Sequence, residues 1–313
     1  MPSYHVFGVR MDCPFELPEL ETSDVAGSAD WRIDACSGTP RGISQPATGA
    51  DTVYGSVQVR SFVSPEMVRL AFDDTGIFDV HPGRVIQWYP GVEGNAAAVR
   101  ADLLGRVLAT AMHLDGALVL HASAVSIDGN VIAFLGPKHA GKSTLAMALV
   151  RRGARLVTDD TLVVWFRGDA AIAVPGIQRV RLWPDSARAI GVTATSGQGA
   201  KPTIDALGAD SREQVEKPLG ACYVVQPVGG SHGLVRRQLS GVQAALTGVS
   251  FSKLAALAGG RLGIEVLERS TRLARLTPVY AAEVPRDLHQ LDRVANAVAQ
   301  WHGASTPNAA GVS

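Results

Sequence analysis

The sequence predicts an α/β domain over residues 96–301, preceded by a β-rich lobe over residues 1–95. Three observations support this division. Short stretches that alternate apolar and polar residues between turn signals fill the first 95 positions, as in strands. A continuous apolar run at 131–135 leads into a glycine-bounded loop, and the apolar face of a helix follows the loop. Residues 302–313 are small and polar, which predicts a frayed, disordered tail.

The composition favours a compact protein whose surface has no excess charge for a partner to bind. The chain has 313 residues, enough for one large domain or two, and 46% of them are hydrophobic while 19% are charged. Lys+Arg and Asp+Glu both number 29, so the charge balance offers nothing for nucleic acid or an anionic membrane to bind. No apolar run reaches the length of a membrane span, and the N-terminus lacks the features of a secretion signal. The cysteines Cys13, Cys36 and Cys222 are scattered, which favours a cytoplasmic location.

The β-rich lobe contains several strand candidates, separated by proline- and glycine-containing turns. They cover residues 4–11, 31–35, 53–63, 67–72 and 85–89. Asp73 and Asp74 stand directly before Thr75 and Gly76, a pattern that favours a hairpin turn over a metal site. No catalytic group of residues is evident in this lobe.

A helix and a hairpin follow the lobe. Asn95 can cap a helix over residues 96–113, in which an apolar residue recurs every four positions and predicts a core-facing stripe. We expect this helix to join the lobe to the second domain. The pair Asp128–Gly129 then predicts a tight turn between a strand at 117–127 and a strand at 131–135.

The loop after the second hairpin strand matches the phosphate-binding pattern G-x-x-x-x-G-K-[ST], known as a P-loop. Its residues are Gly136, Pro137, Lys138, His139, Ala140, Gly141, Lys142, Ser143 and Thr144. The glycines permit a tight turn that points backbone N–H groups at an anion, Lys142 adds a positive charge, and the Ser143 hydroxyl can ligate Mg²⁺. The predicted helix at 142–152 places its N-terminus at the loop, where phosphate binds. The alternative is a tight turn that only resembles a P-loop.

Two carboxylates follow the next predicted strand, which covers residues 154–158. One of Asp159 and Asp160 can hold Mg²⁺ and the other can accept a proton from an attacking hydroxyl, although such pairs also occur in solvated turns. We assign the metal to Asp159 and the base to Asp160, a choice that the sequence alone leaves open. The hairpin brings His121 towards the same loop, where it is either a functional residue or a satisfied structural histidine.

The rest of the chain supplies further elements and one candidate substrate site. Arg179 and Arg181 can bind a phosphate or an acidic substrate group, or can simply occupy the outer face of a strand. Residues 191–216 are polar and predict a mobile loop that can cover the site. The remaining predictions are strands at 162–166, 171–174, 219–225 and 279–284, and helices at 186–189, 251–258, 263–275 and 288–301.

These residues together resemble the HPr serine kinase/phosphorylase family, and more closely the HPr-kinase-like proteins found beside lasso-peptide and related peptide gene clusters. The resemblance lies in the 121–125 stretch His-Ala-Ser-Ala-Val, the P-loop, Arg152–Gly153, the 156–160 stretch Leu-Val-Thr-Asp-Asp and the 181–185 stretch Arg-Leu-Trp-Pro-Asp. Weaker similarity extends over most of the chain. The family usually has a Ser-Gly pair where Lys138 and His139 stand here.

The resemblance implies a P-loop kinase fold of the HPr kinase and phosphoenolpyruvate carboxykinase type, using ATP and Mg²⁺. It implies that Lys142 holds phosphate, that Ser143 and Asp159 hold the metal, and that His121 lies near the γ-phosphate. We therefore expect an ATP-dependent kinase acting on a hydroxyl, most simply a serine of a small peptide or peptide precursor. The alternatives are a small-molecule hydroxyl kinase and a non-catalytic nucleotide-binding regulator. The chain can also form an oligomer.

Overall fold

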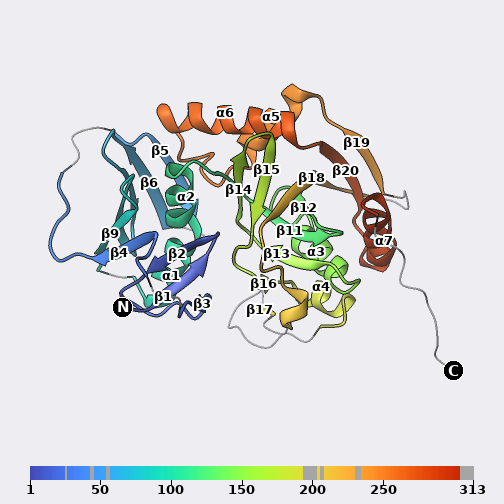
Figure 1. Ribbon diagram of the computed structural model, residues 1–313, viewed down its shortest axis with the longest axis horizontal. Helices are drawn as coiled ribbons and strands as arrows, with labels where there is room; N and C mark the ends of the chain where they lie inside the picture. The colour runs from blue at the N-terminus through green and yellow to red at the C-terminus, as the bar shows by residue number, and fades with distance from the viewer. Residues whose placement is uncertain are drawn as a thin grey trace. The chain divides into compact units, whose positions relative to one another are not determined.

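A computed structural model of the chain describes residues 1–24, 27–42, 46–53, 57–92, 94–192, 203–204, 208–229 and 234–303 (Figure 1). The chain divides into two compact units. The first comprises Met1–Leu120 and Ala245–Leu273, and the second comprises His121–Ala244 and Ala274–Ser313. This division falls later than the boundary near residue 95 that the sequence predicts, because the helix over residues 96–113 contacts the strands of the first unit.

The first unit is built on a sheet of short strands, as the sequence predicts. The strands are β1 (Ser3–Val6), β2 (Val9–Asp12), β3 (Glu21–Thr22), β4 (Trp31–Ala35), β5 (Gly49–Val53), β6 (Val57–Val63), β7 (Val68–Phe72), β8 (Gly76–His81) and β9 (Val85–Pro90). They pair in the order β3-β1-β2-β4-β9-β8-β7-β6-β5. The pairs β2–β4 and β4–β9 are parallel, and the other neighbours are antiparallel.

Two strand predictions in this unit need correction, and one of its hairpin strands was missed. Residues 4–11 form a hairpin instead of one strand, because Phe7 and Gly8 both adopt positive φ, of 54° and 77°, and turn the chain back. The stretch predicted at 53–63 belongs to two strands, β5 and β6, and residues 54–56 lie outside the described residues. Strand β8 was not predicted, although the hairpin turn before it was, and β8 pairs with β7 across that turn.

The predicted helix over residues 96–113 is present but contains a wider turn. It consists of α1 (Ala96–Asp102), the π-helical segment η1 (Leu103–Val107) and α2 (Leu108–Leu114). Asn95 caps it as predicted, since its side-chain oxygen accepts a hydrogen bond from the N–H of Ala98 at 2.9 Å. Asp102 is buried and accepts a hydrogen bond from the Thr75 hydroxyl at 2.7 Å. Burial raises the pKa of this carboxyl to about 6.

The second unit contains the mixed sheet that carries the predicted site. Its strands are β11 (Ala122–Ile127), β12 (Asn130–Leu135), β13 (Arg155–Thr158), β14 (Leu162–Arg167), β15 (Ala170–Val174), β18 (Lys217–Val228), β19 (Val235–Gln238) and β20 (Val279–Pro285). The central order is β13-β11-β12-β18-β20-β19, and the β14–β15 hairpin pairs with the start of β18. The strand predicted at 117–127 is interrupted at His121, which separates β10 (Leu118–Leu120) from β11.

Strand direction brings the predicted site residues to one edge of this sheet. Strand β11 is antiparallel to both β12 and β13, so β12 and β13 run the same way and end at the same edge. Ala122 is paired with Leu135, the last residue of β12, and Ala124 is paired with Thr158, the last residue of β13. The segment that starts β11 and the loops that follow β12 and β13 therefore meet at this edge.

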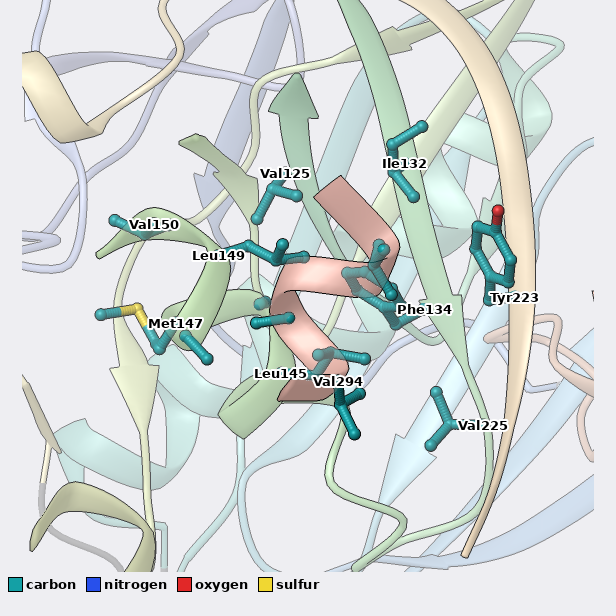
Figure 2. Close-up of a cluster of buried hydrophobic side chains, with 14 of the residues drawn as sticks. Val125, Ile132, Phe134, Leu145, Met147, Leu149, Val150, Tyr223, Val225 and Val294 are labelled. Atoms are coloured by element: carbon teal, nitrogen blue, oxygen red, sulfur yellow. The ribbon is translucent and has the colours of Figure 1, made fainter. Parts of the chain in front are cut away.

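One face of the sheet is covered by α3 (Lys142–Val150) and α7 (Leu291–Trp301), which contact each other. Figure 2 shows the hydrophobic core beneath them, where Leu145 and Leu149 of α3 lie near Phe134 of β12 and Val294 of α7. Burying an aliphatic or aromatic side chain of this size stabilises a fold by about 1.5–3 kcal/mol. This packing fixes the N-terminal end of α3 against the edge where β12 ends.

The remaining predictions have mixed outcomes. Helix α6 (Arg261–Leu276) confirms the prediction at 263–275, and η3 (Leu288–Gln290) with α7 confirms the one at 288–301. The helix predicted at 251–258 is wrong, since those residues form turns after α5 (Gly241–Ser250), which was not predicted. None of the described helices is long and apolar enough to cross a membrane.

Two predicted mobile segments lie partly outside the described residues. Of the tail, residues 304–313 lie outside, whereas His302 is held by a 2.8 Å hydrogen bond between its Nε2 and the Tyr223 hydroxyl. Of the 191–216 loop, residues 193–202 and 205–207 lie outside. Its last part is anchored, because Glu213 is buried and accepts a hydrogen bond from the Ser126 hydroxyl at 2.8 Å.

Candidate functional site

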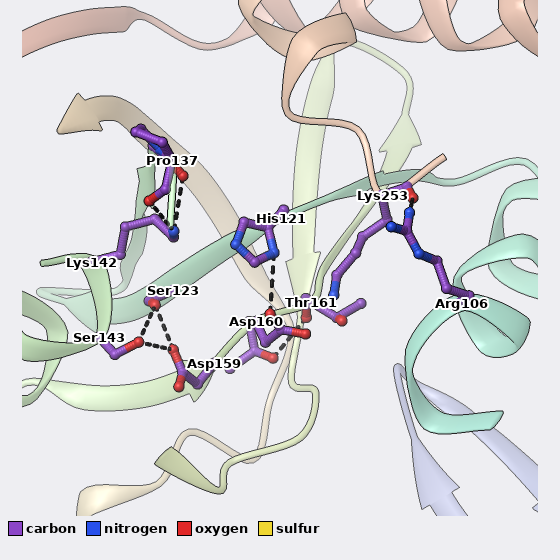
Figure 3. Close-up of polar contacts among 12 residues, drawn as sticks. Arg106, His121, Ser123, Pro137, Lys142, Ser143, Asp159, Asp160, Thr161 and Lys253 are labelled. Carbon is purple, nitrogen blue, oxygen red and sulfur yellow. Dashed lines mark hydrogen bonds and ion pairs between the residues drawn. The ribbon is translucent and has the colours of Figure 1, made fainter. Parts of the chain in front are cut away.

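The candidate site lies where β12 and β13 end, and it combines a glycine-bounded loop with two aspartates and a histidine. Figure 3 shows these side chains together: Lys142 and Ser143 from the start of α3, Asp159 and Asp160 after β13, His121 directly before β11, and Ser123 on β11. All of them belong to the second unit. The predicted neighbourhood of His121, Lys142 and the aspartate pair is therefore present in the structure.

Residues 136–144 connect β12 directly to α3 and turn sharply with backbone conformations that favour glycine. Gly141 has a φ of 92° and Gly136 a φ of 150°, and a Cβ atom at Gly136 would meet the carbonyl oxygen of Val225 at 3.0 Å. His139 also adopts a positive φ, of 68°. Lys142 folds back over this 136–144 loop, and its Nζ donates to the carbonyl oxygens of Gly136 and Pro137 at 2.9 and 3.1 Å. The lysine charge is thus held directly above the loop.

Asp159 is joined to the 136–144 loop through serine hydroxyls. Ser143 Oγ donates to Asp159 Oδ1 at 2.8 Å, and Ser123 Oγ donates to the same oxygen at 2.5 Å. The two hydroxyl oxygens lie 3.3 Å apart. The backbone N–H of Asp159 donates to the carbonyl oxygen of Ile177 at 3.0 Å, which fixes the start of the turn. Asp159 is therefore oriented towards α3 by both its backbone and its side chain.

The charge of Asp159 is influenced by opposing effects. Loss of solvent raises the pKa of its carboxyl above the ordinary value, and the hydrogen bonds from Ser123 and Ser143 oppose that rise. The neighbouring Asp160 raises the pKa further, while the Lys142 charge lowers it. A carboxylate whose charge is costly in this way is stabilised by a cation placed beside it.

Asp160 points towards His121 and is more accessible than its neighbour. His121 Nδ1 lies 3.1 Å from Asp160 Oδ1, and the two side chains are 29% and 60% exposed. The backbone of Asp160 has a φ of 74°, a conformation that non-glycine residues adopt at a cost of about 1–3 kcal/mol. The Thr158 hydroxyl donates to the carbonyl oxygen of Thr161 at 2.7 Å and closes this turn. The strained turn separates the two aspartates, so that one faces α3 and the other faces His121.

The donor set suits a hard cation that is bound together with phosphate. Among the described residues, no cluster of three or more His, Cys, Asp and Glu side chains could hold a metal ion. Ser143 and Asp159 instead offer a hydroxyl and a carboxylate within 2.8 Å of each other. Mg²⁺ binds through one or two protein oxygens, completing its coordination with water and the phosphates of its substrate. The Ser143 and Asp159 oxygens therefore fit Mg²⁺ carried by a nucleotide.

Two neighbours of the site were missed as site residues by sequence reasoning. Ser123 lies two positions after His121, and strand alternation places residues two apart on the same face, so this signal was available. Trp183, 38% exposed, donates from Nε1 to His139 Nδ1 at 3.2 Å, and the two ring centroids are 5.5 Å apart. No local pattern links these two residues, because they are brought together only by the fold.

The predicted substrate arginines lie on a separate short strand. Arg181 is exposed in β16 (Val180–Arg181), which pairs with β17 (Thr203–Ile204), and Arg179 directly precedes it. The 181–185 stretch continues into α4 (Pro184–Ala189), whose N-cap residue is Trp183. Trp183 therefore connects this segment to the 136–144 loop, while the assignment of the arginines to substrate stays a prediction.

The fold and site define a mixed α/β protein with a glycine-bounded loop beside two carboxylates. No protein-family model and no curated protein sequence matches the chain. Among solved structures, the chain is similar to the HPr(Ser) kinase/phosphatase from Coxiella burnetii, with 16% sequence identity and a TM-score of 0.34, covering 59% of this chain and 95% of that one. A TM-score at this level does not establish a shared fold. The geometry of the site, and not this similarity, therefore carries the functional argument.

Proposed function

We propose that this protein is an ATP-dependent kinase that transfers the γ-phosphate of Mg-ATP to a hydroxyl group. The observation that carries the proposal is that the two neighbouring aspartates at the sheet edge have different partners. Asp159 is hydrogen-bonded to Ser143 of the 136–144 loop, while Asp160, one residue later, faces His121 and solvent. Phosphoryl transfer needs positioning, charge neutralisation and a base, and these residues supply all three.

The 136–144 loop holds the triphosphate in this proposal. Its glycine-bounded turn and the N-terminus of α3 present backbone N–H groups to an anion, and Lys142 supplies a positive charge for the outer phosphates. Lys142 exchanges its hydrogen bonds with the carbonyl oxygens of Gly136 and Pro137 for bonds to phosphate. Mg²⁺, held by Ser143 and Asp159, would neutralise charge on the phosphates when it is bound.

Asp160 is the base. In the transfer step the acceptor oxygen forms a bond to the γ-phosphorus, and the bond to the bridging β–γ oxygen breaks, with its electron pair leaving on ADP. The acceptor proton passes to the Asp160 carboxylate, which is 60% exposed and so is accessible to an incoming hydroxyl. His121, 3.1 Å from Asp160 Oδ1, orients that carboxylate. The structure therefore supports the assignment of base to Asp160 and metal ligand to Asp159.

The test is transfer of labelled γ-phosphate in the presence of Mg²⁺. One reaction contains serine-containing peptides and a second contains small hydroxyl metabolites, and products are identified by mass spectrometry. We expect a mass increase of one phosphate on a peptide serine. This expectation follows from the resemblance to HPr-kinase-like proteins found beside peptide gene clusters. A phosphorylated metabolite with unmodified peptides would assign the same chemistry to a small-molecule kinase. Tight ATP binding with no phosphorylated product in either reaction would contradict the kinase assignment and favour a nucleotide-binding regulator.

A further inference from the structure

Ser123 occupies a buried position at the centre of the site. It lies on β11, is 1% exposed, and is paired across the sheet with Phe134 of β12. Its hydroxyl lies 2.5 Å from Asp159 Oδ1 and 3.3 Å from Ser143 Oγ, so that the three side chains form a closed triangle (Figure 3). Among the residues that the structure describes, no other side chain of β11 hydrogen-bonds to Asp159 and also lies beside the Ser143 hydroxyl.

The two serines approach the same oxygen of Asp159. Both hydroxyls donate to Oδ1, and neither forms a hydrogen bond with Oδ2. A carboxylate oxygen accepts about two hydrogen bonds through its lone pairs. Ser123 and Ser143 together therefore saturate Oδ1, which fixes the rotation of the carboxylate and leaves Oδ2 for another ligand.

We propose that Ser123 is a positioning residue for the metal-binding carboxylate, an inference that rests on the proposed function. By holding Oδ1, it keeps Asp159 in the one orientation that presents Oδ2 to a cation while Ser143 remains close. Groups that orient a metal-binding carboxylate commonly change metal affinity by one to two orders of magnitude when they are removed. The cation of the bound nucleotide is the ligand concerned.

Ser126 provides a matched control on the same strand. It is also buried, and its hydroxyl donates to a carboxylate, that of Glu213, at 2.8 Å. Glu213 lies in the segment after η2 (Ala209–Ser211). The hydrogen bonds of its carboxylate are with Ser126, Gln214 and Val215, and none of them involves the 136–144 loop or Asp159. Ser126→Ala therefore removes the same kind of interaction from the same strand without affecting the orientation of Asp159.

The experiment measures ADP binding by calorimetry at increasing Mg²⁺ concentration, for the full-length wild type and for Ser123→Ala and Ser126→Ala. We expect Ser123→Ala to raise the Mg²⁺ concentration needed for tight ADP binding about tenfold, while ADP affinity without Mg²⁺ changes less than about twofold. Ser126→Ala should follow the wild type in both measurements. Equal Mg²⁺ dependence in the two variants would overturn the role of Ser123.

A pair of isosteric variants at position 123 keeps the test decisive even if Ser123→Ala folds poorly. Ser123→Thr retains the hydroxyl and Ser123→Val replaces it with a methyl group, with nearly the same side-chain volume. We expect the threonine variant to keep the Mg²⁺ dependence of the wild type and the valine variant to lose it, and identical behaviour of the pair would reject the inference. A wild type whose ADP binding is insensitive to Mg²⁺ would reject the proposed function as well, which separates that failure from failure of the Ser123 role alone.

Discussion

Ser143 Oγ and Asp159 Oδ1 lie 2.8 Å apart, although their residues follow different strands of the sheet. This contact joins the loop after β12 to the turn after β13, and it exists because both strands end at the same edge beside β11. A hydroxyl and a carboxylate that face each other at a helix N-terminus form the part of the site suited to a metal-bound phosphate.

Replacing Lys142 with alanine should weaken ATP binding by about 10–100-fold, since a hydrogen bond from a charged group contributes about 1.5–3 kcal/mol. The side chain is nearly buried over the loop and bonded to two of its carbonyl oxygens. Equilibrium titration with ATP and with AMP provides the measurement. AMP lacks the outer phosphates that Lys142 binds in the proposed function, so its affinity should change much less, and equal losses for both ligands would point to a general disruption of the loop.

Asp160→Asn should abolish phosphate transfer while leaving ATP binding near that of the wild type. Asparagine keeps the size of the side chain but cannot accept the acceptor proton, and loss of a general base slows such steps by about 10²–10⁴-fold. Initial rates with labelled ATP and the accepted substrate measure this effect. Asp169→Asn, in the exposed turn between β14 and β15, serves as the matched control. Retained transfer in Asp160→Asn would remove this aspartate from the base role.

Trp183→Phe should remove most of the change in tryptophan fluorescence that accompanies ATP binding. The indole of Trp183 donates to His139 in the 136–144 loop and lies beside its ring, so a ligand in the loop alters its surroundings. Trp165→Phe, on β14, should leave the fluorescence change intact. A full fluorescence response in Trp183→Phe would show that the contact between this tryptophan and the loop does not respond to the ligand.

Asp102→Asn should stabilise the first unit at neutral pH but not at acidic pH. The folded-state pKa of Asp102, about 6, lies above the ordinary value of 3.8. The folded state therefore holds this proton more tightly than the unfolded chain does, so the favourable contribution is complete below pH 3.8 and is lost as pH rises through 6. The difference between the two pKa values corresponds to about 3 kcal/mol.

Urea unfolding of the wild type and of Asp102→Asn at pH 4 and pH 7.5 measures this difference. The gain in the free energy of unfolding from the substitution should be larger at pH 7.5, and the exposed Asp73→Asn should show little change between the two pH values. A gain that is the same at both pH values would mean that Asp102 does not carry this pH dependence. Thr75 can still donate to the asparagine oxygen, so the hydrogen bond itself is preserved in the variant.

Sequence patterns predicted the parts of this site that lie on strongly periodic or motif-bearing segments. The strand, loop and helix over residues 131–150 are present because an apolar run, two glycines and a helical apolar face all favour the same structure. The hairpin turn at Asp128–Gly129 correctly placed His121 near the end of β12. The aspartate pair was expected at the end of a buried strand, and it lies there.

The rest depends on contacts between segments that are distant in sequence. Trp183 contacts His139 only because the segment before α4 packs beside the 136–144 loop, and no periodic pattern in the sequence indicates that contact. The division of the chain at Leu120 could not be predicted either, because residues 245–273 return to the first unit. The turn at Phe7–Gly8 was missed although the sequence carries a signal for it. The apolar positions change phase there, from Tyr4 and Val6 to Val9 and Met11, where positive φ values reverse the chain.

The dependence of ATP affinity on Mg²⁺, compared between the wild type and Asp159→Asn, tests the central claim most directly. Calorimetric titration of each protein with ATP, with Mg²⁺ and with a chelator present, gives four affinities. We predict that Mg²⁺ tightens ATP binding to the wild type by at least about tenfold and that Asp159→Asn loses most of this gain. Wild-type affinity that is unaffected by Mg²⁺, or an unchanged gain in Asp159→Asn, would contradict a metal-bound triphosphate held between the 136–144 loop and this aspartate.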